Sequence, residues 1–190
     1  EICEDLWTPQ PPSIRHALSG ATVVINCSAS NETIGKDTYR RQLVMGQSAR
    51  LVCAYIYSSA GEGESTQDIV FGGHNIICEN GTILSEAKRY KNESIYADID
   101  VSRIASERRR MTTFDTAHND NYRVVGFKTV VEELELIRYF DKAPFVPSDM
   151  VTRNQRCEEI LDIQTYGLKK RLEHTNCKSA VIGISGGLDS

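Results

Sequence analysis

Two runs of small and β-branched residues, with a helical stretch between them, constrain the fold most. Residues 21–30 read ATVVINCSAS and residues 51–59 read LVCAYIYSS. Such runs are typical of buried strands. Between them, residues 35–50 read GKDTYRRQLVMGQSAR, in which apolar side chains recur at helical spacing. This strand–helix–strand pattern predicts an α/β domain whose sheet is covered by helices.

The neighbouring segments extend the same pattern. Residues 11–13, Pro-Pro-Ser, predict the beginning of a short helix. Asn80-Gly81, inside an alternating stretch, is the strongest hairpin signal in the chain. IYADIDV at 95–101 predicts a further strand, and SRIASERRRMTTF at 102–114 predicts a helix.

A second domain is predicted towards the end of the chain. The pattern loosens after Phe114, and KAPFVPSD has the two prolines of an extended linker. Residues 152–176 then predict one long amphipathic helix, and SAVIGIS at 179–185 predicts a buried strand. We therefore divide the chain into a first domain at 1–126, a linker at 127–150 and the start of a second domain at 151–190.

Composition narrows the class of protein. The chain is 40% hydrophobic and 25% charged, as ordinary globular proteins are. A net charge of −4 gives no reason to expect nucleic acid as a partner, and we interpret the basic triplet 108–110 as a solvated helix face. No apolar run approaches the ~18 residues of a membrane span. The first residue is glutamate rather than methionine, so both ends are expected to be cut.

The six cysteines form no C-x-x-C pair, so no metal site is expected. Three of them lie in apolar runs and are interpreted as small buried core residues: Cys27, Cys53 and Cys78. This usage fits a reducing compartment better than a disulfide framework, which predicts a cytoplasmic protein.

The final stretch, GISGGLDS at 183–190, has the character of a phosphate site. A predicted strand runs into a glycine turn, where backbone N–H groups can face an anion. The loop lacks the lysine of the Walker pattern and does not fit the G-x-G-x-x-G dinucleotide pattern. S-G-G-L-D-S resembles the pyrophosphate loop of the ATP pyrophosphatase superfamily. The resemblance implies that ATP phosphates bind at Gly183, Ser185, Gly186, Gly187, Asp189 and Ser190, with Asp189 ordering the loop or a Mg²⁺ ion.

The other end, EICEDLW, places a cysteine where a strand turns sharply. A thiol on such a turn can act as a nucleophile, and the next backbone N–H can face an oxyanion. The alternative interpretation of Cys3 is an inert core residue. I-C-E-D-L-W-T-P resembles the cysteine motif of the nitrilase superfamily, whose members hydrolyse amides through a Cys–Glu–Lys triad. The resemblance implies that the glutamate and lysine lie upstream of this chain.

The two motifs together resemble the glutamine-dependent NAD synthetase family. The resemblance implies an α/β fold: part of a nitrilase-like αββα sandwich, followed by the first helix and strand of an ATP pyrophosphatase domain. It implies that Cys3 hydrolyses glutamine and that the ammonia amidates deamido-NAD through an ATP-derived adenylate. Glutamine would be bound by Glu4, Trp7, Ser30 and Lys36. A large homo-oligomer such as an octamer, with no nucleic acid or membrane partner, is also implied.

Two other functions are consistent with the motifs. One is a nitrilase-type amidohydrolase joined to a different ATP pyrophosphatase, and the other is a catalytically dead binding module. Three further ionisable residues are candidate acid–base groups: Glu62, Glu64 and His74. We interpret Glu62 and Glu64 as loop carboxylates, and His74 as a satisfied polar strand residue, with an interdomain contact as a third possibility.

Overall fold

The computed structural model describes residues 1–64, 68–114, 122–130, 132–133 and 135–188. These residues form two compact units, Glu1–Arg138 and Tyr139–Ser190, and each is described by itself. The boundary between the units falls inside the segment that the sequence assigns to a linker. The three-part division of the chain stays a prediction.

The first unit is built on the predicted strand–helix–strand motif. Strand β1 (Val23–Ser28) pairs in parallel with β2 (Ala54–Ser59), and helix α2 (Lys36–Leu51) makes the crossover between them. Parallel neighbours require such a crossover because a tight turn would reverse the chain. The α/β class is therefore confirmed.

The sheet continues as a hairpin, giving the order β1-β2-β3-β4. Strands β3 (Ile76–Glu79) and β4 (Thr82–Glu86) are antiparallel and joined at the predicted Asn80-Gly81 turn. Both turn residues take positive φ, 45° and 83°, as a two-residue hairpin requires. A Cβ on Gly81 would lie 2.9 Å from the Ala49 Cβ, so the turn also needs glycine to approach α2.

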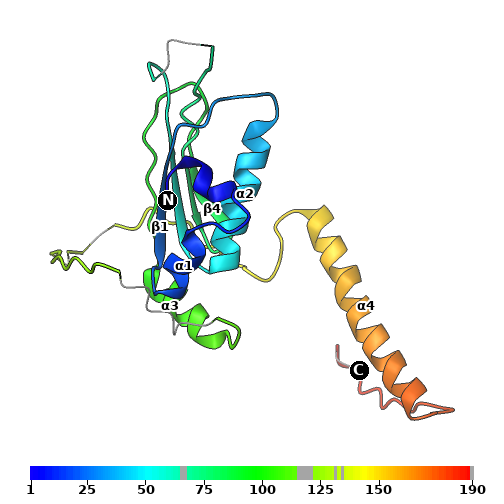
Figure 1. The fold of residues 1–190 in the computed structure, drawn as a ribbon. Helices are drawn as coiled ribbons and strands as arrows, with labels where there is room; N and C mark the ends of the chain where they lie inside the picture. The colour runs from blue at the N-terminus through cyan, green and yellow to red at the C-terminus, as the bar shows by residue number, and fades with distance from the viewer. Residues whose placement is uncertain (65–67, 115–121, 131, 134, 189–190) are drawn as a thin grey trace. The chain divides into compact units, whose positions relative to one another are not determined.

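Helices cover one face of the sheet, as Figure 1 shows for α1 (Ser13–Leu18) and α2. A short 3₁₀ helix, η1 (Cys3–Trp7), begins the chain and packs against β1 and α2. The apolar core lies between these helices and the sheet. Its buried members are Leu6, Ala17, Val24, Val44, Leu51, Cys53, Tyr55, Tyr57, Ile76 and Cys78.

Two of the three cysteines predicted to be buried are in this core. Burial raises the pKa of the Cys53 and Cys78 thiols to about 12. The prediction for Cys27 is wrong, because its side chain is exposed. Residues alternate between the two faces of β1, and Ile25 on the same face as Cys27 is 54% exposed.

The predicted strand at 95–101 is also wrong, since residues 91–100 form no strand. Asp100 instead caps α3 (Val101–Arg110), where its carboxylate accepts a 2.8 Å hydrogen bond from Arg103 N–H. Asp100 N–H donates to the Glu79 carboxylate at 2.8 Å. The carboxylates of Asp100 and Glu79 thus accept hydrogen bonds from backbone N–H groups that would otherwise pair with a neighbouring strand.

The basic triplet is not wholly solvated, because Arg108 is buried, with 7% of its surface exposed. Its guanidinium donates hydrogen bonds to the carbonyls of Ala17, Ala21, Leu51 and Val52. Three of these carbonyls lie at or beside the carboxyl ends of helices α1 and α2, where the last carbonyls lack helical partners. The prediction holds only for the other two arginines of the triplet, which are exposed.

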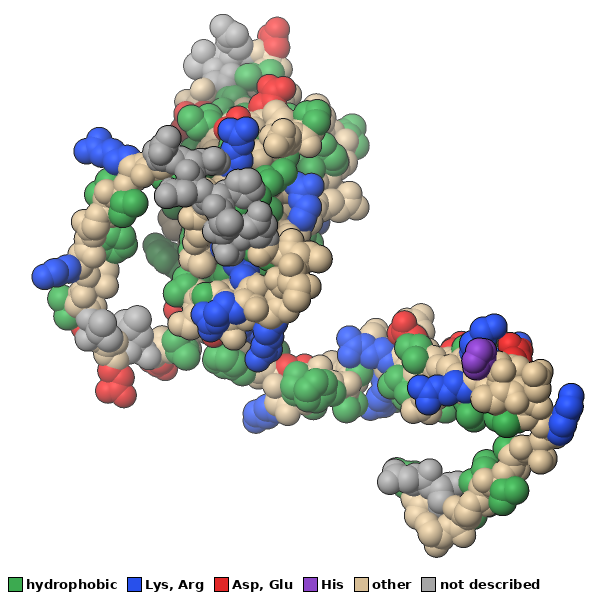
Figure 2. All heavy atoms as spheres, turned by 60° about the horizontal axis from the view of Figure 1, so that its bottom comes forward, with side chains coloured by type: hydrophobic (Ala, Val, Ile, Leu, Met, Phe, Trp, Pro, Cys, Tyr) green, Lys and Arg blue, Asp and Glu red, His purple; other side chains and the backbone are tan. Residues whose placement is uncertain are grey.

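The second unit contains helix α4 (Met150–His174), which confirms the helix predicted at 152–176. Asp149 caps it by accepting from Thr152 N–H at 2.8 Å. Apolar side chains of α4, such as Ile160 and Ile163, are exposed, and Figure 2 shows hydrophobic side chains open along this unit. No helix among the described residues has the length and apolarity needed to cross a membrane.

The strand predicted at 179–185 is not formed. Val181, Ile182 and Ile184 are all at least 72% exposed. A buried strand exists only when neighbouring strands complete its backbone hydrogen bonds. The described part of this unit has no other strand with which the segment could pair.

Candidate active site

Cys3 lies on a strained turn beside the first strand. Ile2 forms a parallel bridge with Cys27 of β1, and the chain then turns into η1. Cys3 itself takes a φ of +47°, in the left-handed region that residues with a side chain rarely occupy. Such backbone outliers gather at functional sites, because the surrounding structure must enforce them. The side chain is half-buried.

Asp5 of the motif closes this turn. Its carboxylate accepts a 2.8 Å hydrogen bond from Ile2 N–H, and its own N–H donates to the Ile2 carbonyl at 3.1 Å. The Thr8 hydroxyl donates to the Asp5 carbonyl at 3.0 Å. The Asp5 side chain thus supplies one half of a capping box while a backbone bond closes the turn, so these contacts of Asp5 are structural.

Asn26, in the middle of β1, contacts the Cys3 backbone on both sides. Its Oδ1 accepts from Cys3 N–H at 3.0 Å, and its Nδ2 donates to the Cys3 carbonyl at 3.3 Å. The Ser28 hydroxyl donates to the same Oδ1 at 2.7 Å, and Nδ2 also donates to the Tyr55 hydroxyl at 3.2 Å. Tyr55 in turn donates to the Glu1 carboxylate. Sequence reasoning missed Asn26, although a lone asparagine within VVINC is a detectable signal.

Glu4 and Trp7, both predicted to line a glutamine pocket, have different surroundings. Glu4 is exposed, directly after Cys3. Trp7 is half-buried and packs against the apolar core. Their glutamine contacts stay a prediction.

Ser30 and Lys36, the other predicted glutamine-binding residues, lie beyond the carboxyl end of β1. Ser30 is buried, and its hydroxyl accepts from the Arg40 guanidinium at 3.4 Å. Lys36 begins α2 and donates from Nζ to Asn31 Oδ1 at 2.9 Å. Because Cys3 is bonded to β1 and these residues follow β1, all three lie towards one end of that strand. Ligands of α/β proteins bind at this end of a strand.

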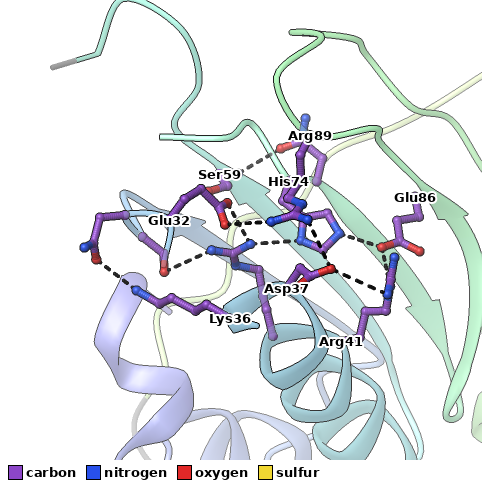
Figure 3. A network of polar contacts seen from close by, with 12 residues as sticks. Glu32, Lys36, Asp37, Arg41, Ser59, His74, Glu86 and Arg89 are labelled. Carbon is purple, nitrogen blue, oxygen red and sulfur yellow. Dashed lines mark hydrogen bonds and ion pairs between the residues drawn. The ribbon is translucent and has the colours of Figure 1, made fainter. Parts of the chain in front are cut away.

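Through Arg40, Ser30 contacts a network of charged groups that is seen in Figure 3. Arg40, 2% exposed, forms a 3.0 Å ion pair with Glu32 and a 2.9 Å hydrogen bond to His74 Nδ1. His74 Nε2 lies 2.5 Å from the Glu86 carboxylate, which also accepts from Arg41 Nε at 2.6 Å. Buried charges are stable in proteins only when they are paired in this way.

The network fixes the protonation of its members. An arginine only donates, so His74 Nδ1 must accept, and the histidine proton lies on Nε2, facing Glu86. Burial opposes ionisation of Glu86. The hydrogen bonds from His74 and Arg41 outweigh that effect and hold the pKa of the carboxyl below its ordinary value. Both ring nitrogens of His74 are thus satisfied, as predicted, but the residue lies just before β3 and not in a strand as predicted.

The outer edge of the network borders a cavity of about 400 Å³. Arg89, which lines this cavity, forms ion pairs with Glu32 at 3.5 Å and with Asp37 at 3.4 Å. Five of the lining residues, Asp37, Arg41, His74, Glu86 and Arg89, pair with one another, as Figure 3 shows. Its lining includes Asp37, Arg41, His74, Glu86, Lys88 and Arg89.

The predicted phosphate loop is described up to Leu188, and Asp189 and Ser190 lie outside the described residues. Gly186 takes a φ of +84°, which favours glycine. Gly187 N–H donates to the Ser185 hydroxyl at 3.4 Å. Phosphate binding by this loop stays a prediction. Among the described residues, no group of three or more His, Cys, Asp or Glu could hold a metal ion.

Comparison with known proteins gives relatives along the whole chain. The chain is 43% identical over 205 residues to the glutamine-dependent NAD(+) synthetase of Mycobacterium leprae, covering 100% of this chain and 29% of the relative. It is 42% identical over 200 residues to the enzyme of the same name from Mycobacterium bovis, covering 100% and 30%. The chain thus spans less than a third of these curated relatives. No protein-family model matches it.

A solved structure supports the fold. Nit3 of Saccharomyces cerevisiae, a member of branch 10 of the nitrilase superfamily, matches with a TM-score of 0.51 and 24% identity. The match covers 64% of this chain and 42% of that chain. At this identity the likeness shows the fold alone. The predicted nitrilase-like architecture of the first unit is confirmed to that extent.

Proposed function

Because the chain belongs to the glutamine-dependent NAD(+) synthetase family, with relatives that match along its full length, we propose that it carries the glutaminase nucleophile of such an enzyme. Cys3 is that nucleophile. The observation that carries the proposal is the strained backbone of Cys3, held at φ +47° on a turn beside β1. An inert core cysteine needs no such conformation.

The reaction at Cys3 is an acyl transfer. The thiolate attacks the side-chain carboxamide carbon of glutamine, a C–S bond forms and the C–N bond breaks. The thiol proton leaves with the amino group as ammonia. Water then cleaves the γ-glutamyl thioester, which releases glutamate and returns the proton to Cys3. The resemblance assigns the proton transfers to a glutamate and a lysine upstream.

The Glu4 N–H supports this chemistry as an oxyanion donor. It lies in the first turn of η1, where helix N–H groups lack helical partners and favour negative charge. Lys36 supports recognition of the glutamine carboxylate, because its half-buried ammonium can pair with an anion. Its bond to Asn31 positions that ammonium.

The second unit contributes to ATP use in this proposal. Ammonia amidates deamido-NAD after ATP has activated the acid as an adenylate, with release of pyrophosphate. Gly183, Ser185, Gly186 and Gly187 would hold the phosphates through backbone N–H groups and a hydroxyl. Asp189 and Ser190 are proposed for the same loop, with Mg²⁺ as the counter-ion. The protein would act in the cytoplasm. It would assemble as a homo-oligomer, and light scattering of the full-length protein tests that oligomeric state.

The decisive experiment separates the two half-reactions in the full-length protein. Cys3→Ala should abolish NAD synthesis from glutamine and leave synthesis from added ammonia intact, since ammonia bypasses the thioester. The matched control is Cys27→Ala, because Cys27 is an exposed cysteine on the neighbouring strand β1. This substitution should change neither the glutamine-dependent nor the ammonia-dependent synthesis. Equal loss of both activities in Cys3→Ala would contradict the assignment.

The same assay separates the alternatives. An amidohydrolase joined to another ATP pyrophosphatase would hydrolyse glutamine without amidating deamido-NAD. A binding module would perform neither reaction.

A further inference from the structure

The conformation of Cys3 needs an explanation that the motif itself does not supply. A residue with a Cβ at φ +47° pays a steric cost, so the surrounding structure must hold it there. The contacts of Asp5 fix the peptide group before Cys3 through Ile2. They do not reach the peptide group that follows Cys3.

One side chain reaches both peptide groups. Asn26 Oδ1 accepts from Cys3 N–H at 3.0 Å, and Asn26 Nδ2 donates to the Cys3 carbonyl at 3.3 Å. The first bond holds the peptide that precedes the Cys3 Cα, and the second holds the peptide that follows it. Together they restrain φ and ψ of Cys3, the two dihedrals that direct its Cβ.

The second bond also determines where the Glu4 N–H points. The Cys3 carbonyl and the Glu4 N–H belong to one planar trans peptide, so they point in opposite directions. Drawing the carbonyl towards buried Asn26 turns the N–H away from the core. Asn26 therefore orients the nucleophile and the proposed oxyanion donor at the same time.

Asn26 is itself held rigidly. It is 0% exposed, and its carboxamide makes four hydrogen bonds, two at Oδ1 and two at Nδ2. An amide flip would set its NH₂ group against the Cys3 N–H, which can only donate. Tyr55 passes the chain of bonds on to Glu1, whose carboxylate accepts from Ser13 N–H at 2.6 Å. Hydrogen bonds at both Oδ1 and Nδ2 therefore hold the Asn26 side chain in place.

We propose that Asn26 is the positioning residue of the glutaminase reaction, and this inference rests on the proposed role of Cys3. Asn26 touches no substrate and acts through the backbone of Cys3. Its loss should lower kcat for glutamine more than it raises KM, because misaligned groups weaken the transition state and not the recognition of the amino acid.

The test uses the full-length protein and both ammonia sources. Asn26→Asp keeps the size and an acceptor for Cys3 N–H but removes the donor to the Cys3 carbonyl. We expect kcat with glutamine to fall about 10²-fold, the scale of losing one oxyanion donor. KM for glutamine should stay within about twofold. Ammonia-dependent synthesis should not change, and it reports that the protein is folded.

Two further variants keep the result interpretable. Ser48→Ala removes a buried hydroxyl that donates to the Cys53 carbonyl at 2.7 Å, remote from Cys3, and should leave kcat unchanged. Tyr55→Phe removes only the hydroxyl that orients the Asn26 amide. Tyr55→Phe should also lower kcat for glutamine, but by less than Asn26→Asp does. It replaces Asn26→Asp as the test if that variant fails to fold.

The outcomes distinguish this inference from the proposed function. If Cys3→Ala abolishes glutamine use while Asn26→Asp and Tyr55→Phe keep full kcat, the positioning role of Asn26 is wrong and the nucleophile stands. If Cys3→Ala still uses glutamine, the proposed function itself is wrong, and the inference that rests on it is wrong as well. Loss of ammonia-dependent synthesis in both Asn26→Asp and Tyr55→Phe would also overturn the inference, because the network would then serve folding.

Discussion

Replacing Arg108 by alanine should loosen the carboxyl ends of two helices at once. The guanidinium donates at 2.9 Å to Val52, at 3.0 Å to Leu51, at 2.8 Å to Ala21 and at 3.4 Å to Ala17. All four acceptors are backbone carbonyls. Alanine would leave those that are buried without a partner, and water reaches them poorly.

The magnitude follows from the three shorter bonds. A hydrogen bond from a charged donor contributes about 1.5–3 kcal/mol, so three give a gross loss of roughly 4.5–9 kcal/mol. Burial of the guanidinium offsets part of this. The same burial lowers the pKa of Arg108. Its contact over the Phe114 ring, at 4.8 Å, adds a smaller contribution. We expect a net destabilisation of about 3–5 kcal/mol, the scale of breaking a buried polar network.

Hydrogen exchange measured by mass spectrometry on the full-length protein is the suitable assay, because it reports local opening without assuming two-state unfolding. Amides near the end of α2 should exchange faster in Arg108→Ala by about two to three and a half orders of magnitude. Arg109→Ala is the matched control, since Arg109 is the exposed neighbour on the same helix. It should change stability by less than about 0.5 kcal/mol. Equal exchange in the two variants would refute the reasoning.

Three other results are expected. Glu79→Gln should lose less stability in acid than the unmodified protein does. Hydrogen bonds from Arg138 outweigh burial and lower the pKa of Glu79, so its contribution to stability is full above pH of about 4.5 and disappears as pH falls through the lowered pKa. Urea midpoints of the variant and the unmodified protein, measured from neutral to acid pH, test this, and parallel curves of midpoint against pH would contradict it. Lys36→Ala should raise KM for glutamine with kcat nearly unchanged, and unaltered steady-state constants would make it a surface residue. Iodoacetamide at neutral pH should label exposed Cys27 well before Cys53 and Cys78, whose pKa values are about 12, and equal labelling rates would contradict their burial.

Local patterns predicted the parts of the fold that local chemistry determines. The Asn80-Gly81 hairpin formed because few other residue pairs tolerate two positive φ values in succession. The strand–helix–strand motif around α2 formed because its two strands are continuous runs of small and β-branched residues, and parallel neighbours need a crossover. The turn at Cys3 was predicted because acidic residues and a proline-bearing stretch follow the cysteine, and the Asp5 carboxylate closes that turn.

Contacts between distant segments explain what the sequence did not predict. Arg108 and its two neighbours look alike in sequence, and only the packing of α3 on residues 17–52 selects one for burial. Asn26 is satisfied by partners 23 and 29 residues away. The stretch 95–101 alternates like a strand, yet residues 95–100 form no strand, and the Asp100 cap and its bond to Glu79 lead the chain to the start of α3.

The central claim is that Cys3 forms a covalent γ-glutamyl thioester, and trapping that intermediate tests it most directly. The full-length protein would be mixed with glutamine, quenched in acid during turnover and digested for peptide mass mapping. The account predicts a glutamyl adduct on the peptide that contains Cys3, absent in Cys3→Ala. A glutamyl adduct on another cysteine such as Cys27, or normal glutamine turnover by Cys3→Ala, would contradict it.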